Sequence, residues 1–173
     1  MHDPLTQITH CLCLGLHYEE ITELINFLRP STALARNPLF VPVSLLVLSC
    51  KQLSTSVDGM QEALWQVQKE TELYGAGIVD SLGDFGQPNL PKIIRKLTNL
   101  SDTYTRSLSS MKSLEQVLKL VEEVFREQYR GGTPGYSIIQ SEVQIIQQTI
   151  YGSQHQVEWF QASAQSQVQT VCG

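Results

Sequence analysis

The feature that most constrains this chain is an unbroken four-three spacing of apolar residues from Leu39 to Tyr74. A repeat kept for five heptads predicts a long helix with one narrow apolar stripe, here called the seam, that packs against other helices. Pro38 and Pro42 fall in the first turn, where a missing N–H is tolerated, and Asn37 is the expected N-cap. The seam positions are Leu39, Val43, Leu46, Cys50, Leu53, Val57, Met60, Leu64, Val67, Thr71 and Tyr74.

The same spacing returns twice, each time after a glycine-rich break. A second seam helix is predicted from Leu90 to about Gln128, and a third from about Tyr136 towards the C-terminus. Residues 75–89 and 131–135 are rich in glycine and proline, which end helices and reverse the chain. The second seam reads Leu90, Ile93, Leu97, Leu100, Tyr104, Ser107, Met111, Leu114, Leu118, Val121, Phe125 and Gln128. The third reads Ile139, Val143, Ile146, Ile150, Ser153, Val157, Phe160, Ala164, Gln167 and Val171.

The N-terminal residues predict two shorter elements. Residues 8–16 alternate loosely and indicate a short strand or extended arm closed at Gly15. Residues 18–28 carry Ile21, Leu24, Ile25 and Leu28 at helical spacing, which predicts a short amphipathic helix ended by Arg29 and Pro30.

Three long helices joined by short reversals must run up, down and up. The predicted fold class is therefore all-α: an elongated antiparallel three-helix bundle, or coiled coil, with a small N-terminal strand-plus-helix appendage. We expect residues 1–36 to form the appendage and residues 37–173 the bundle. A length of 173 residues with 42% hydrophobic content fits a domain of ordinary size.

Charge and hydropathy exclude several classes of partner. The chain has 12 basic and 17 acidic residues and a formal net charge of −5, which disfavours phosphate-driven binding, so we expect no nucleic-acid partner. No run approaches the ~18 uncharged apolar residues of a membrane span, and residues 39–50 fit a buried helix start. The N-terminus does not have the pattern of a secretory signal, so we expect a cytoplasmic location with cysteines as thiols and Cys50 as a small core residue.

The one cluster of soft metal ligands in the sequence is His10, Cys11, Cys13 and His17. Zinc sites usually pair cysteines two to four residues apart with a second pair downstream, whereas a single residue separates Cys11 from Cys13. We therefore favour one polar face of a strand over a metal site. We expect no metal and no other cofactor.

Other patterns also have a structural explanation that we favour. Glycine-rich residues 75–86 lack the lysine of a phosphate-binding loop, so a helix reversal is favoured. Glu122, Glu123 and Glu127 could hold a divalent cation or act as acid and base, but a solvated helix face is favoured.

Two tryptophans stand out on the seam helices. Trp65 and Trp159 each lie one position off a seam, where they could stack on a ligand or partner. We favour the alternative that they widen the core stripe, as a bundle helix needs. His155 is interpreted as a surface residue. Asn99 begins a triplet that matches the N-glycosylation pattern, but we discount it because it falls inside a predicted helix.

The segment Asn37-Pro38-Leu39-Phe40-Val41-Pro42 resembles the His-Pro-Leu-Leu-x-Pro opening of the long helix in CorA-like proteins of filamentous fungi, relatives of the magnesium channel family. Asn37 stands where histidine is usual. The stretch from Cys11 to Gly15, the short helix to Leu28 and the glycine-bounded loop also fit that family in order and length.

The resemblance implies the cytoplasmic helical part of such a magnesium-transporter-like protein, with a scaffold or regulatory role and no catalysis. In that family the last helix continues to two membrane spans with a Gly-Met-Asn signature, which this sequence lacks, so contact with a membrane would come only through a further C-terminal region. No pore residue is carried over. The alternative is a self-standing interaction module of spectrin-like or syntaxin-like proportions that binds partner helices or forms a homo-oligomer. A narrow bundle core leaves little room for an enzyme pocket.

Overall fold

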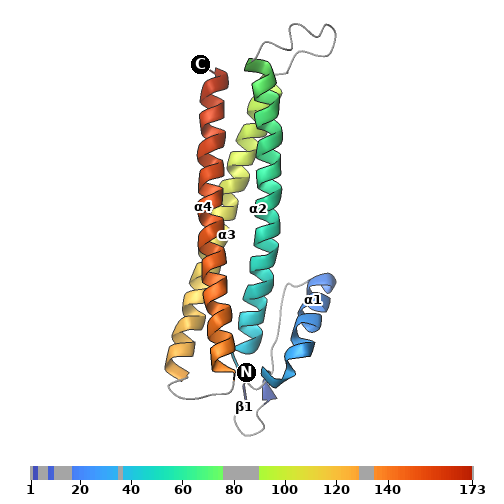
Figure 1. The fold of residues 1–173 in the computed structure, drawn as a ribbon, viewed down its shortest axis with the longest axis vertical. Coiled ribbons are helices and arrows are strands. Elements are labelled where there is room, and N and C mark those ends of the chain that lie inside the picture. Colours follow the sequence, from blue (N-terminus) through green and yellow to red (C-terminus); the bar gives the residue numbers. More distant parts are fainter. Residues whose placement is uncertain are drawn as a thin grey trace. The chain divides into compact units, whose positions relative to one another are not determined.

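The chain folds as an all-α protein, as predicted, in a computed structural model that describes residues 2–3, 8–9, 17–34, 37–75, 90–128 and 135–172 (Figure 1). The helices are α1 (Tyr18–Leu28), η1 (Arg29–Leu34, a 3₁₀ helix), α2 (Phe40–Gly75), α3 (Leu90–Gln128) and α4 (Tyr136–Cys172). The predicted bounds of the four α-helices are confirmed to within two residues. The 3₁₀ helix η1 follows α1 directly and begins at Arg29 and Pro30, which the sequence predicts as the end of the short helix.

Two very short strands precede the helices. β1 (His2–Asp3) pairs antiparallel with β2 (Ile8–Thr9), with His2 opposite Thr9 and Asp3 opposite Ile8. The predicted strand or arm over residues 8–16 begins at β2, and its remaining residues lie outside the described part of the chain.

The seams are buried, as the spacing predicts. In α2 no seam position from Leu39 to Val67 is more than 9% exposed. In α4 all eight seam positions from Ile139 to Ala164 are buried, including the polar Ser153. Of the eleven seam positions of α3 whose burial the structure describes, Leu90, Leu100, Ser107 and Leu114 are half-buried. The seven buried positions are Ile93, Leu97, Tyr104, Met111, Leu118, Val121 and Phe125. Each long helix therefore buries most of its four-three stripe.

Packing divides the chain into two compact units, each with a section of every long helix. Unit 1 comprises Met1–Gln52 and Ser113–Ile150, and unit 2 comprises Leu53–Lys112 and Tyr151–Gly173. The expected division into residues 1–36 and 37–173 stays a prediction.

In unit 1, the start of α2 is held by Asn37. The side chain of Asn37 is buried, and its Oδ1 accepts a hydrogen bond from the Leu39 N–H at 2.9 Å. Its carbonyl accepts one from the Phe40 N–H at 3.0 Å, and the Leu39 carbonyl accepts the first full helical bond from Val43. Asn37 thus has the role predicted for the N-cap.

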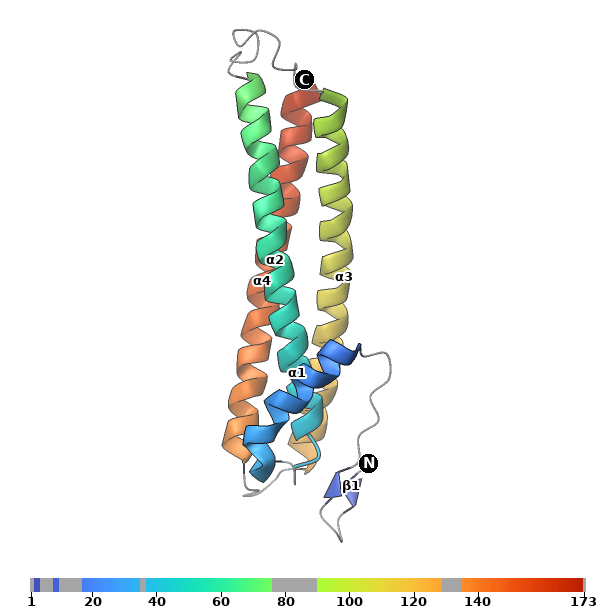
Figure 2. The ribbon, with the colours of Figure 1, turned by 90° about the vertical axis from the view of Figure 1, so that its right-hand side faces the viewer.

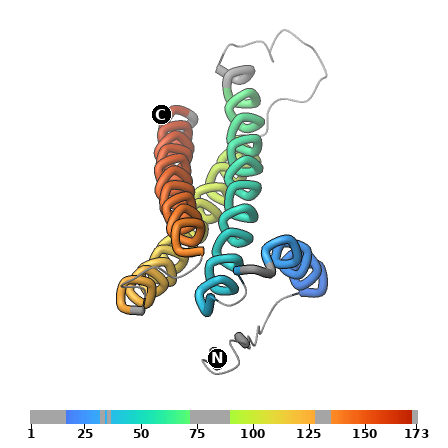
Figure 3. The backbone as a smooth tube through the Cα atoms, turned by 60° about the horizontal axis from the view of Figure 1, so that its bottom comes forward, coloured from blue at the N-terminus to red at the C-terminus, as the bar shows by residue number. Residues whose placement is uncertain are grey.

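The first turns of α2 bury a second face besides the seam. Ser44 and Leu48 are 1% and 9% exposed although neither lies on the seam. Lys51 and Gln52, three and four residues after Leu48, contact α1: Lys51 Nζ lies 2.5 Å from Glu23 Oε1, and Gln52 Nε2 donates to Glu20 Oε1 at 3.3 Å. Figures 2 and 3 show α1 beside this part of α2. Burial under α1 explains why residues 39–50 are apolar on more than one face.

The apolar face predicted for α1 is only partly buried. Leu24 is 7% exposed, whereas Ile21 and Ile25 are 40% and 46% exposed. The helix therefore contacts α2 along an edge, with charged and amide side chains beside Leu24, and not along the full four-residue stripe that the spacing predicts.

By length and composition, α2 is the one helix in the described ranges that could cross a membrane. The segment is Phe40–Thr71, and less than half of its most apolar stretch is buried. A core helix of a water-soluble protein meets the same criterion.

In unit 1, α3 ends and α4 begins at a close stack of two rings. The rings of Phe125 and Tyr136 lie 4.6 Å apart, centroid to centroid. Gly135, just before α4, has φ +82°, a backbone conformation that favours glycine. A Cβ there would also displace the flexible end of the Leu34 side chain, whose Cδ2 would lie 2.4 Å away. The Gly135 carbonyl accepts the Ile139 N–H at 3.1 Å.

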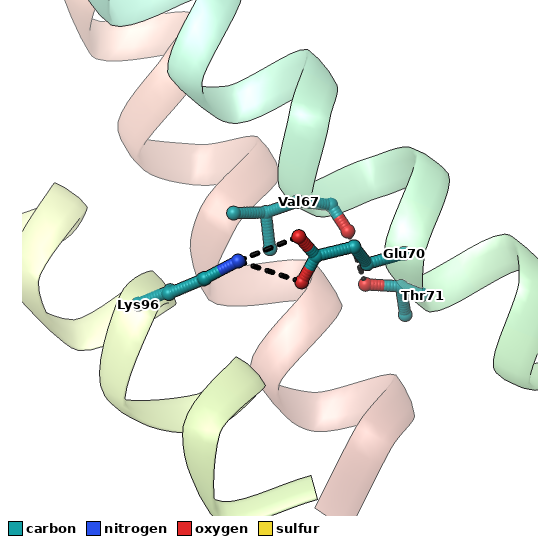
Figure 4. A network of polar contacts seen from close by, with 4 residues as sticks. All are labelled: Val67, Glu70, Thr71 and Lys96. Atoms are coloured by element: carbon teal, nitrogen blue, oxygen red, sulfur yellow. Dashed lines mark hydrogen bonds and ion pairs between the residues drawn. The ribbon is translucent and has the colours of Figure 1, made fainter. Parts of the chain in front are cut away.

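In unit 2, cross-helix contacts fix the chain directions. The Tyr104 hydroxyl donates to the Met60 carbonyl at 3.3 Å, and Lys96 Nζ lies 2.5 and 2.8 Å from the two carboxylate oxygens of Glu70 (Figure 4). From Met60 to Glu70 the chain advances along α2, whereas the partner in α3 changes from Tyr104 back to Lys96. These two sections therefore run in opposite directions.

Candidate functional site

The site that best fits a binding function is a groove on unit 2 between α2 and α4. Its volume is about 490 Å³, within the ~300–1,000 Å³ usual for ligand pockets. The lining residues are Asp58, Gln61, Glu62, Leu64, Trp65 and Gln68 from α2, with Trp159 and Phe160 from α4.

The floor and the walls of the groove come from neighbouring positions in the sequence. Leu64 and Phe160 lie on the seams and are 2% and 3% exposed, so they form an apolar floor. Trp65 and Trp159 are next to them in sequence and are 53% and 62% exposed. A step of one residue turns about 100° around a helix axis, which carries each indole from the core to the groove wall.

The favoured interpretation of the tryptophans as core-widening residues is therefore wrong. Both indoles are exposed on the same groove, and the open alternative, stacking on a ligand or partner, remains. The signal available in the sequence was their phase: Trp65 directly follows the seam residue Leu64, and Trp159 directly precedes the seam residue Phe160. Asp58 lies seven residues before Trp65 on the same helix face.

Polar contacts hold the groove side chains. Gln68 Nε2 donates to Ser163 Oγ at 3.1 Å and joins α2 to α4. Gln66 Nε2 donates to Glu62 Oε1 at 2.7 Å and restrains that carboxylate. The Trp159 and Phe160 rings meet edge to face, with centroids 5.6 Å apart. The groove thus combines two indoles with the carboxylates of Asp58 and Glu62.

Tyr104 supports the floor from inside the core. Its ring centroid lies 6.0 Å from that of Phe160, and its side chain is fully buried. Burial raises the pKa of Tyr104 to about 12, because the phenolate would lose its hydration. The hydroxyl is therefore neutral at physiological pH and serves packing.

A second hollow, of about 350 Å³, lies between α2 and α3 of unit 2. Beside it, the Glu70–Lys96 ion pair is partly exposed, at 44% and 37%, so it contributes at most about 1 kcal/mol. Asn99, which begins the glycosylation triplet, lines this hollow inside α3, as expected of a helix residue. The hollow has no aromatic or acidic lining and carries less chemistry than the α2–α4 groove.

Of the four metal-ligand candidates, the structure describes only His17. His10, Cys11 and Cys13 lie outside the described residues. His17 is exposed at the start of α1, where its backbone N–H donates to Glu20 Oε2 at 2.7 Å. That hydrogen bond is the largest cause of the lowered pKa of Glu20, and the hydrogen bond from the Gln52 amide lowers the pKa further.

Other candidates from the sequence are placed as follows. Within the described ranges no three His, Cys, Asp or Glu side chains gather closely enough to hold a metal ion, and this includes the carboxylates near residues 122–127. The glycine-rich residues 76–89 lie outside the described chain. Cys50 is a buried seam residue, as expected, and burial raises the pKa of its thiol. His155 is exposed, with Nε2 3.0 Å from the Tyr151 hydroxyl.

Comparisons with protein-family models, with curated proteins and with solved structures found no match to this chain.

Proposed function

We propose that this protein is a non-catalytic helical scaffold domain that binds a partner protein through the α2–α4 groove. One observation carries the proposal: Trp65 and Trp159, the chain's two tryptophans, are both more than half exposed on one groove. Tryptophan is among the residues most enriched at the energetic centres of protein interfaces, and large exposed apolar patches mark interaction sites and binding grooves.

We further infer that α2, α3 and α4 form one elongated antiparallel three-helix bundle. Support comes from the three buried seams and from the opposite chain directions of α2 and α3 in unit 2. Helices of 36 to 39 residues would give a rod of roughly 55 Å. A maximum dimension far below that in solution scattering would contradict this arrangement.

The CorA-like origin is a second candidate. The observation in its favour is that the segment from Asn37 to Pro42 opens the most apolar of the three long helices with a buried, hydrogen-bonded cap. In this proposal the domain lies on the cytoplasmic face of a membrane protein. Sequencing the transcript beyond Gly173 tests it: two apolar spans would support the proposal, and a stop codon without them would remove it.

The binding role is tested with a double variant, Trp65→Ala with Trp159→Ala, in affinity purification of the full chain. We expect the partner retained by the wild type to be lost. Tyr151→Ala is the matched control, because Tyr151 is an exposed aromatic residue of α4 outside the groove. If the wild type and Tyr151→Ala self-associate and the double variant does not, the partner is a second copy of this chain. Retention of every partner by a folded double variant would refute the proposal.

A further inference from the structure

We infer that the α2–α4 groove binds an arginine side chain of its partner. This inference rests on the proposed function and names the chemical group that the groove recognises. The lining residues described include two carboxylates, Asp58 and Glu62, and neither lysine nor arginine. These carboxylates are four residues apart, so both project from one face of α2. Their negative charge favours a cation in a groove whose other walls are aromatic.

The indole walls favour the same ligand. Tryptophan binds cations over its ring face better than the other aromatic residues do. Trp65 already accepts one: Lys69 Nζ lies 5.5 Å from its ring centroid, and Lys69 is not among the groove's lining residues. Trp65 thus binds a cation of its own chain outside the groove, and Trp159 offers a second indole inside the groove.

Arginine fits this set of groups better than lysine. Its planar guanidinium can stack on an indole while its fork of N–H donors binds a carboxylate in a bidentate manner. Glu62 is held in place for such a contact by Gln66. The apolar floor of Leu64 and Phe160 matches the methylene stem, which long cationic side chains lay along apolar surface.

The two tryptophans also supply the assay. Because both line the groove, tryptophan fluorescence excited at the red edge of the absorption band, where the six tyrosines absorb little, reports on this site. The probe is an alanine-rich peptide with one arginine, and its control is the same peptide with citrulline, which keeps the shape and removes the charge. We expect a saturable change with the arginine peptide and binding at least about tenfold weaker with the citrulline peptide.

Charge variants test the carboxylates. Asp58→Asn together with Glu62→Gln should weaken binding of the arginine peptide about tenfold, with helicity unchanged. Asp102→Asn, at an exposed acid of α3 outside the groove, should bind like the wild type. Equal binding of both peptides, or no effect of the double charge variant, would overturn the inference.

The failure of this inference and that of the proposed function are distinguishable. If the partner is lost from the Trp65→Ala, Trp159→Ala variant while the arginine peptide does not bind, the arginine inference fails and the binding role stands. If the peptide binds but every partner is retained by that variant, the proposed function fails.

Discussion

Replacing Tyr104 with phenylalanine isolates the free energy of one buried hydroxyl and its ionisation. The hydroxyl donates to the Met60 carbonyl at 3.3 Å, which is long for an O–H···O bond. A typical net hydrogen bond is worth about 1 kcal/mol, so near pH 8 we expect Tyr104→Phe to lower the free energy of unfolding by no more than that. The ring and its contact with Phe160 are kept.

At alkaline pH the wild type should no longer be more stable than Tyr104→Phe. The pKa of Tyr104 is about 12 in the folded protein against 10 for an unhindered tyrosine. The unfolded chain therefore ionises first, and stability falls as the pH rises above about 10. With these values the loss at pH 11 is about 1.4 kcal/mol, since each pKa unit corresponds to 1.36 kcal/mol. Tyr104→Phe escapes this loss and should equal or exceed the wild type there.

Urea denaturation followed by circular dichroism at pH 8 and pH 11 measures both quantities. The raised pKa of Cys50 adds to the alkaline loss, but equally in both proteins, so it cancels in the difference. Met111→Leu, a buried seam variant without an ionisable group, should follow the pH dependence of the wild type. If the stabilities of Tyr104→Phe and the wild type fell in parallel, the burial argument for Tyr104 would be refuted.

Three further predictions concern the seam, a buried amide and the start of α1. Leu64→Ala should cost about 2–5 kcal/mol because Leu64 is 2% exposed, whereas Trp65→Ala should cost about 1 kcal/mol or less; equal shifts in thermal melts would contradict the seam. Gln167→Met should stabilise by about 1 kcal/mol in denaturant titrations, because Gln167 Oε1 is buried with no hydrogen-bond partner among the described residues. A loss of stability would contradict that. Because the pKa of Glu20 is lowered in the folded protein, its carboxylate stabilises the folded state at pH values above the ordinary pKa of 4.5. This stabilisation is lost as the pH falls through the pKa that Glu20 has in the folded protein. Protection of the first α1 amides from hydrogen exchange should therefore drop in acid, and Glu20→Gln should show no such drop.

The helix bounds and the buried seams could be predicted because their causes are local. Glycine and proline end helices wherever they cluster, and a four-three stripe must be buried against something. Leu97 and Val157, each 0% exposed, follow from that spacing alone. The partner of a stripe is a different matter, because it depends on residues far apart in the chain.

The non-local features show why the rest was missed. The second buried face of α2 depends on α1, through pairs such as Glu23 with Lys51, which are 28 residues apart. The groove depends on α2 and α4 meeting where each carries a tryptophan, 94 positions apart in sequence. Phase placed Trp65 and Trp159 one step off their seams, but only the packing of unit 2 decides whether that step leads into the core or onto the surface.

Register in unit 2 is a problem that the seams cannot solve by themselves. Sliding one helix by a heptad, about 10 Å, would bring apolar seam positions opposite one another again. The off-seam pairs do not survive such a slip: Glu70 would lose Lys96, and Gln68 would lose Ser163. Each pair is individually weak, yet together with the Tyr104 hydroxyl they favour one register over its neighbours. The groove exists only in that register, because the slip would part the α2 carboxylates and Trp65 from Trp159 on α4.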